Sequence, residues 1–177
     1  VVGDGGKRDV GKRNTEVNKI PKADQFSSFT NTKFSSGVAS YEAAASVWER
    51  EIKENSDLLE EFRNLFLVDE NKFDFELFDN LFIPNWYNIF TFNFDNVLEV
   101  TQEKCLIKRY AVRAYPHESN DNNDPCILHL HGLINEGSDL DNIVFTSTSY
   151  TRLGNSKHDL YDVLHGDVNT NEKNLVI

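Results

Sequence analysis

Two short segments of the chain carry polar side chains whose types and spacing could bind or transform a ligand. The first contains Thr91, Asn93 and Asp95, which alternate with Phe92 and Phe94 at the end of an aromatic stretch. Period-two alternation predicts that the three polar side chains face one side of an extended segment and that the two rings face the interior. Such a polar row suits a ligand cleft, but Asn and Asp also form turns and helix caps, so both interpretations stay open.

The second segment ends an apolar stretch and contains His129, Leu130, His131 and Gly132. Both histidines face the same way on a strand, and Gly132 allows another backbone or a ligand to approach closely. A metal site would need a third ligand that the neighbouring sequence does not offer. We interpret His129 as a hydrogen-bonded core histidine. His131, at the strand end, suits a general base because imidazole titrates near neutral pH.

Hydrophobic patterning predicts the elements that position these segments. Residues 86–92 and 126–131 are predicted to be strands, and residues 40–52 have helical periodicity. Strands that alternate with helices predict an α/β fold, with a Rossmann-like, mostly parallel sheet covered by helices on both faces. Ligands of such sheets bind beyond the carboxyl ends of the strands, which is where Asn93 and His131 are expected.

The pattern also divides the chain into a lead-in and a folded domain. Residues 1–39 contain a glycine turn and then a stretch rich in Lys, Asn, Ser, Thr and Gly, which predicts a flexible loop to about Ser36. Residues 40–177 hold the predicted core elements. A further strand at residues 175–177 coincides with the chain end, and no methionine occurs even at position 1. We therefore expect part of a longer protein, truncated at the C-terminus.

Composition and charge exclude several classes of function. A chain of 177 residues, 39% of them apolar, supports one domain, and no run approaches the roughly 18 apolar residues of a membrane span. Residues 34–177 carry a net charge of −14, which would repel a phosphate backbone, so we expect no nucleic-acid partner. Two cysteines, Cys105 and Cys126, are too few for a disulfide scaffold or a four-thiolate zinc site. We expect a cytoplasmic protein.

Taken together, these segments resemble the sirtuin-like (silent-information-regulator-type) domains found in bacterial defence proteins. Residues 89–99 carry Thr-x-Asn-aromatic-Asp followed by a hydrophobic pair and Glu, and residues 130–132 read Leu-His-Gly. Residues 143–153 resemble the short strand and turn that follow in these domains. The order and separation of the three stretches also fit, and the resemblance covers about residues 40–177.

The resemblance implies a Rossmann-type sheet with NAD⁺ as the substrate. It implies that Asn93 orients the nicotinamide ribose or the attacking water, and that His131 is the base toward a ribose hydroxyl or that water. Asp95 is expected to help seat the nicotinamide end of the cofactor, and Thr91 is a further residue expected to bind the cofactor. Positive charge develops on the ribose as the glycosidic bond breaks, so an amide that positions a nucleophile beside a base suits the reaction.

The chain departs from the zinc-bearing deacylase sirtuins at three places. It has Phe92 where they carry Gln, and it lacks their four-cysteine zinc module. Without that module, protein deacylation and ADP-ribosyl transfer are disfavoured, and we expect no zinc or other metal. Gly3 and Gly5 correspond to the glycine turn that contacts the cofactor phosphates, although turns of this kind also occur in ordinary loops. Between them stands Asp4, whose negative charge would disfavour a pyrophosphate.

We therefore expect an NAD⁺ glycohydrolase that releases nicotinamide and ADP-ribose. By resemblance alone, it would be the effector domain of an anti-phage defence protein. The alternative is a non-catalytic domain that binds NAD⁺ or ADP-ribose as a sensor or scaffold. The expected partner is NAD⁺, with neither nucleic acid nor membrane, and formation of a homo-oligomer through the full-length protein is left open.

Overall fold

The computed structural model describes residues 20–71, 73, 75, 78, 80–105, 110–116, 125–135, 137–155 and 159–169. Gly3, Gly5 and the predicted strand at residues 175–177 lie outside these described residues. None of the described helices is both long and apolar enough to cross a membrane. In chain order the elements are α1 (Ala23–Phe34), α2 (Tyr41–Glu54), α3 (Asp57–Phe66), β1 (Asn88–Thr91), α4 (Val97–Cys105), β2 (Ala111–Ala114), β3 (Cys126–His129), the 3₁₀ helix η1 (Leu140–Asn142), α5 (Ser147–Asn155) and α6 (Asp159–Asn169).

The sheet consists of three parallel strands in the order β1-β3-β2. Thr91, the last residue of β1, and Ala114, the last residue of β2, both lie opposite His129, the last residue of β3. The three carboxyl ends therefore meet at one edge of the sheet. This arrangement confirms the predicted α/β fold with a parallel sheet.

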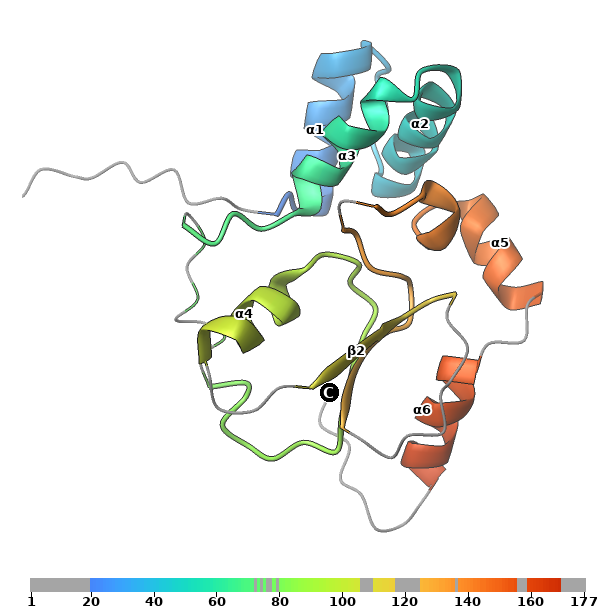
Figure 1. Cartoon of the computed structure of the whole chain (residues 1–177). Coiled ribbons are helices and arrows are strands. Elements are labelled where there is room, and N and C mark those ends of the chain that lie inside the picture. Colours follow the sequence, from blue (N-terminus) through green and yellow to red (C-terminus); the bar gives the residue numbers. More distant parts are fainter. Residues whose placement is uncertain are drawn as a thin grey trace, which may run out of the picture.

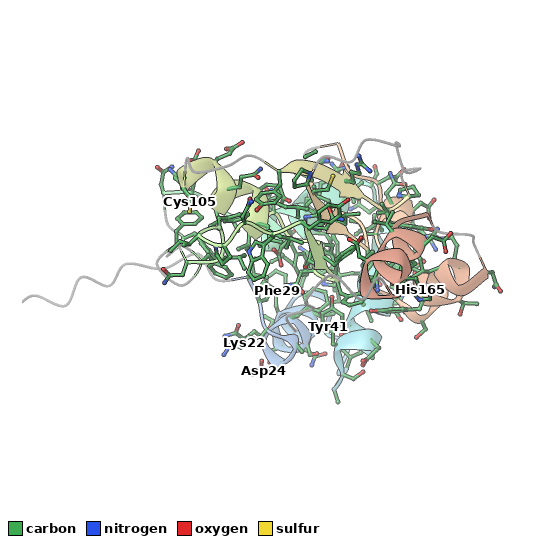
Figure 2. All side chains as sticks on the ribbon, turned by 90° about the horizontal axis from the view of Figure 1, so that it is seen from below. Lys22, Asp24, Phe29, Tyr41, Cys105 and His165 are labelled. Atoms are coloured by element: carbon green, nitrogen blue, oxygen red, sulfur yellow. The ribbon has the colours of Figure 1, made fainter. Side chains whose placement is uncertain are left out.

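Helices cover both faces of the central strand β3, whose four side chains are all buried. Cys126 and Leu128 pack against α6, whereas Ile127 packs in a cluster with residues of α4. Because successive side chains of a strand point to opposite faces, α6 and α4 lie on opposite sides of the sheet. Figures 1 and 2 both show this arrangement, with Cys105 marking the end of α4 and His165 lying in α6.

Helices α1, α2 and α3 form a separate group in Figure 1 and share an aromatic core. Trp48 of α2 is fully buried, and its ring centroid lies 5.5 Å from that of Phe62 in α3. Phe62 in turn lies 5.1 Å from Phe145, and Phe66 lies 4.9 Å from Phe94. The helical group therefore packs on the segments that follow β1 and η1, and the first of these contains Asn93 and Asp95 of the predicted site.

Helix α1 corrects the prediction that the lead-in is a loop to about Ser36. Phe26 and Thr30 lie one helical turn apart, and both are fully buried. The Thr30 hydroxyl donates to the Phe26 carbonyl at 2.8 Å and accepts from the Trp48 indole N–H at 3.0 Å. The prediction was wrong for residues 23–34 because a buried threonine takes the place of an apolar residue in the helical pattern.

Residues 143–145 form an extended segment rather than a strand of the sheet. Ile143, Val144 and Phe145 are all buried. The Val144 N–H donates to the carbonyl of His131 at 2.8 Å, which joins this segment to the end of the predicted second site segment.

Candidate functional site

The candidate site lies at the edge of the sheet where the carboxyl ends of β1 and β3 meet. Thr91 and His129 are partners in the parallel ladder, so the residues that follow them emerge side by side. The Leu130 N–H donates to the Thr91 carbonyl at 2.9 Å, and the Ile134 N–H donates to the Phe94 carbonyl at 2.6 Å. The two polar segments that the sequence singled out are thus joined by backbone hydrogen bonds.

Asn93 is exposed at this edge, and its backbone is held on both sides. Its N–H donates to Oγ1 of Thr91 at 3.0 Å, and its carbonyl oxygen lies 2.9 Å from Nδ1 of His129. The hydrogen bond to Thr91 closes a tight turn directly after the strand. The Thr91 hydroxyl therefore shapes the loop that presents the Asn93 amide.

This turn corrects the predicted alternation of residues 91–95. The extended strand stops at Thr91, so the side chain of Phe92 is 55% exposed instead of lying in the interior. Phe94 does lie inward, with its ring centroid 4.9 Å from that of Phe66 and 6.3 Å from that of Phe145. Strand periodicity cannot be extended past a residue whose side chain hydrogen-bonds to the backbone and turns the chain.

His129 is a buried histidine whose two ring nitrogens both have hydrogen-bond partners, as predicted. Nδ1 lies 2.9 Å from the Asn93 carbonyl oxygen, and Nε2 lies 2.7 Å from Oε1 of Glu99 in α4. Burial by itself lowers the pKa of His129. The hydrogen bond and negative charge of Glu99, helped by the Asn93 carbonyl and Asp95, outweigh burial and raise the pKa above its ordinary value.

Asp95 lies two residues before helix α4 and close to this histidine. Its Oδ1 accepts from the Val97 N–H at 3.2 Å, as a helix-capping carboxylate does. Burial raises the pKa of Asp95, and the nearby Glu99 adds to the increase, while the Val97 N–H and His129 oppose it. Asp95 therefore has the helix-capping role that the sequence left open. It lies close to the exposed amide of Asn93.

His131 lies in a setting of aromatic rings, and 9% of its surface is exposed. Its ring centroid lies 4.9 Å from that of Phe92 and 5.1 Å from that of Tyr150, which it meets edge to face at 90°. Tyr161 of α6 lies 6.5 Å from Phe92. We call Phe92, Tyr150 and Tyr161 the aromatic rim. Because Phe92 directly precedes Asn93, the rim connects the two predicted catalytic residues.

The start of helix α5 fixes the position of Tyr150 in the rim. Oγ1 of Thr146 accepts from the Ser149 N–H at 3.1 Å, and Oγ of Ser149 accepts from the Thr146 N–H at 2.8 Å. This reciprocal pair satisfies backbone donors at the helix terminus in the manner of a capping box. Tyr150, the next residue, is thereby held against His131 while half of its surface stays exposed.

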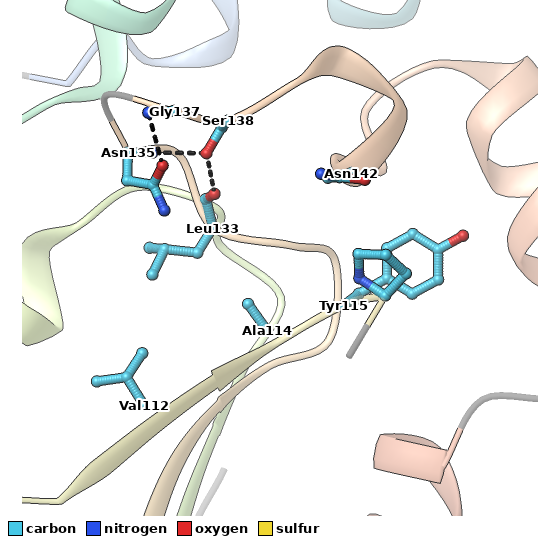
Figure 3. Close-up of a pocket in the computed structure, with 9 residues that line it drawn as sticks. Val112, Ala114, Tyr115, Leu133, Asn135, Gly137, Ser138 and Asn142 are labelled. Carbon is cyan, nitrogen blue, oxygen red and sulfur yellow. Dashed lines mark hydrogen bonds between the residues drawn. The ribbon is translucent and has the colours of Figure 1, made fainter. Parts of the chain in front are cut away.

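An open cavity of about 680 Å³ lies beside this edge, at the carboxyl end of β2 (Figure 3). Its wall includes Val112 and Ala114 of β2, Leu133 and Ser138 from the loop after β3, and Asn142 at the end of η1. Neither Asn93 nor His131 is among the residues that line it. The cavity is therefore a neighbour of the candidate site and not its centre.

The described residues contain no group of three or more His, Cys, Asp or Glu side chains that could hold a metal ion. The ring of His129 faces Glu99, whereas the ring of His131 faces the rim. The arrangement offers an amide, an imidazole and aromatic faces to a ligand.

Residues 87–177 match the sequence model of the SIR2-like domain. The chain belongs to the SIR2-like domain family. This family includes NAD-dependent enzymes and its domains bind NAD, so the function of this SIR2-like chain is NAD-related. The matched region contains both site segments and all of the rim. No curated protein and no solved structure matches the chain.

Sequence reasoning missed two residues of the site. Glu99, in the first turn of α4, entered only as part of a family pattern. Tyr150 likewise lay within residues 143–153 without an assigned role. Both act through partners that are distant in the chain, His129 for Glu99 and His131 for Tyr150.

Proposed function

We propose that this SIR2-like chain hydrolyses NAD⁺ to nicotinamide and ADP-ribose, with Asn93 and His131 as catalytic residues. The observation that carries the proposal is the exposed amide of Asn93 on a backbone anchored at both its N–H and its carbonyl. It stands at the carboxyl edge of a parallel sheet, where such folds bind ligands. A fixed backbone with a free side chain suits a group that positions a reactant.

In the proposed reaction, water attacks C1′ of the nicotinamide ribose. The C1′–N bond breaks, and nicotinamide leaves as a neutral molecule with the bonding electron pair. Asn93 orients the water or the ribose hydroxyls as positive charge develops at C1′. His131 accepts the proton that the water loses when the new C1′–O bond forms, and passes it to solvent. The products are nicotinamide, ADP-ribose and a proton.

The aromatic rim supports placement of the nicotinamide end at this edge. Phe92 and Tyr150 are 55% and 50% exposed, respectively, and flank His131. Exposed ring faces next to a base suit a flat aromatic leaving group, which stacks on them in offset or edge-to-face geometry. Asp95 contributes a carboxyl group close by. Phosphate contacts are proposed at Gly3 and Gly5.

A second candidate function is binding of NAD⁺ or ADP-ribose without catalysis. Burial of His131 favours it, because only 9% of that residue is exposed and the neighbouring rings would have to shift before water reached the imidazole. The role as an effector of anti-phage defence is part of the first proposal and rests on the family resemblance. It predicts loss of cellular NAD⁺ when the intact protein is triggered.

The experiment that separates the two functions follows NAD⁺ in ¹⁸O-labelled water with the intact protein. Hydrolysis gives nicotinamide and ADP-ribose that carries ¹⁸O at C1′ in equal amounts. A binding domain gives saturable NAD⁺ binding and no release of nicotinamide. Nicotinamide release without ¹⁸O in the ribose product would point to transfer or cyclisation and would reject the proposed hydrolysis.

A further inference from the structure

The backbone of Asn93 is held by two side chains while its own amide is left exposed. Its N–H donates to Oγ1 of Thr91, and its carbonyl oxygen lies 2.9 Å from Nδ1 of His129. A backbone carbonyl has no proton to give, so Nδ1 is the donor. The ring of His129 is 1% exposed and cannot turn toward solvent without opening the core.

The other ring nitrogen faces a carboxylate that has few partners of its own. Nε2 of His129 lies 2.7 Å from Oε1 of Glu99. Oε2 of Glu99 is buried and accepts no hydrogen bond from the described part of the chain. An ionised carboxylate also only accepts, so Nε2 donates as well. A ring that donates from both nitrogens is an imidazolium, and its charge balances that of Glu99.

We propose that Glu99 and His129 are positioning residues that hold the backbone of Asn93, so that its amide is presented to the ligand. This inference rests on the proposed function of Asn93. Neither residue touches the substrate. Glu99 keeps the His129 ring oriented, and His129 carries the hydrogen bond to the Asn93 carbonyl.

The hydrogen bond to Asn93 depends on the protonation state of His129. When the imidazolium loses a proton beside the Glu99 carboxylate, the remaining proton stays on Nε2, because a charged acceptor binds it more strongly than a carbonyl. The lone pair of Nδ1 then faces the Asn93 carbonyl oxygen, and the contact becomes repulsive. The titratable groups around His129 are Glu99 from α4 and Asp95 from the turn, while Tyr115, next to β2, donates its backbone N–H to the His129 carbonyl.

Glu99→Gln removes the negative charge beside His129 but keeps a hydrogen-bonding group at the same position. The amide of the glutamine donates to Nε2 of a neutral His129, which leaves the proton on Nδ1 and preserves the bond to Asn93. The bond therefore survives at high pH in this variant and is lost in the wild type. Glu103→Gln is the matched control, because Glu103 is exposed on the same helix.

The kinetic test is the pH dependence of kcat for nicotinamide release by the intact wild-type protein and by both variants, corrected for spontaneous NAD⁺ breakdown. The wild type and Glu103→Gln should lose up to about 10²-fold in kcat as His129 deprotonates, since a misplacement of about 1 Å costs that much. KM should change less. Glu99→Gln should lack this alkaline decrease. An alkaline decrease in Glu99→Gln equal to that of the wild type would overturn the proposal.

A structural readout decides the question independently of activity. In NMR titrations, the carbonyl carbon shift of Asn93 should move together with the ring nitrogens of His129 in the wild type. It should stay constant in Glu99→Gln. If the wild type releases no nicotinamide, the proposed function fails. The titration then still tests whether Glu99 and His129 hold the backbone of Asn93. If the carbonyl carbon shift of Asn93 stays constant in the wild type while His129 titrates, the proposed positioning role of Glu99 and His129 is overturned. This test needs only the wild type, so it still applies if Glu99→Gln does not fold.

Discussion

A Cβ atom on Gly132 would lie 2.0 Å from the backbone carbonyl oxygen of Asn142. Gly132 also has a φ of +89°, in the region that side chains disfavour. The close approach of these two backbones brings the extended segment after η1 against the end of the second site segment. The glycine was predicted to allow such an approach, and the structure confirms that the partner is a backbone.

Gly132→Ala should therefore destabilise the protein by at least about 2 kcal/mol, because it adds a backbone clash to a conformational strain of about 1–2 kcal/mol. Chemical unfolding measures the change. Gly166→Ala in α6 is the control, since nothing lies within 4 Å of its added Cβ, and it should be neutral or stabilise by up to about 1 kcal/mol. Equal stability of the two variants would show that the close approach does not exist in solution.

The buried pair of Thr30 and Trp48 gives a test of helix α1. Thr30→Val removes the acceptor of the Trp48 indole N–H and should cost about 1–3 kcal/mol, because a buried donor is left unsatisfied. Thr32→Val is matched to it: Thr32 makes the same bond to a carbonyl four residues back but is exposed. It should change stability by less than about 0.5 kcal/mol. A stable Thr30→Val variant would place α1 outside the core.

Phe92 and Phe94 are predicted to behave in opposite ways on truncation to alanine. Phe94→Ala should lose at least about 2 kcal/mol of stability, because its ring packs on Phe66 and Phe145. Phe92→Ala should lose less than about 1 kcal/mol, since 55% of this side chain is exposed. It should instead weaken NAD⁺ binding, which isothermal titration calorimetry measures. A similar large loss of stability in both variants would support the continuous strand that simple alternation predicted, in which both rings face the interior.

Asp95→Asn should stabilise the protein at neutral pH while slowing nicotinamide release. Burial is the main cause of the raised pKa of Asp95, so the folded state prefers the protonated form. Its contribution to stability is therefore present below the ordinary Asp pKa of about 3.9 and is lost as pH rises through the raised value. Asparagine stays neutral and still caps α4. Urea unfolding should show the advantage of Asp95→Asn growing from about pH 4 upward, with Asp162→Asn as the control for loss of one exposed carboxylate.

Patterns within one element of the chain were sufficient to predict the framework. The apolar run at residues 126–131 identified β3, and the aromatic stretch before Asn93 identified β1. Their alternation with helices gave a parallel sheet, whose geometry requires the ends at Thr91 and His129 to meet. The location of the candidate site follows from that requirement alone.

Side-chain hydrogen bonds account for the features of the fold and the site that the sequence did not predict. The orientation of Phe92 depends on the hydrogen bond from the Asn93 N–H to Oγ1 of Thr91. This bond turns the chain and ends the strand periodicity. The partner of His129 is Glu99, 30 positions earlier in the chain, and a single sequence contains no signal for such a contact. Helix α1 was missed because Thr30 occupies a position that the apolar pattern assigns to a hydrophobic residue.

The most direct test of the account measures kcat for nicotinamide release by the intact protein with Asn93→Ala and His131→Ala. Two controls accompany them: Asn142→Ala, which alters the cavity beside β2, and His165→Ala, an exposed histidine of α6. Asn93→Ala and His131→Ala should each lower kcat by at least about 10²-fold, with normal folding and little change in NAD⁺ affinity, while both controls keep wild-type turnover. Wild-type turnover in His131→Ala and Asn93→Ala, or a loss confined to Asn142→Ala, would contradict the proposed catalytic pair.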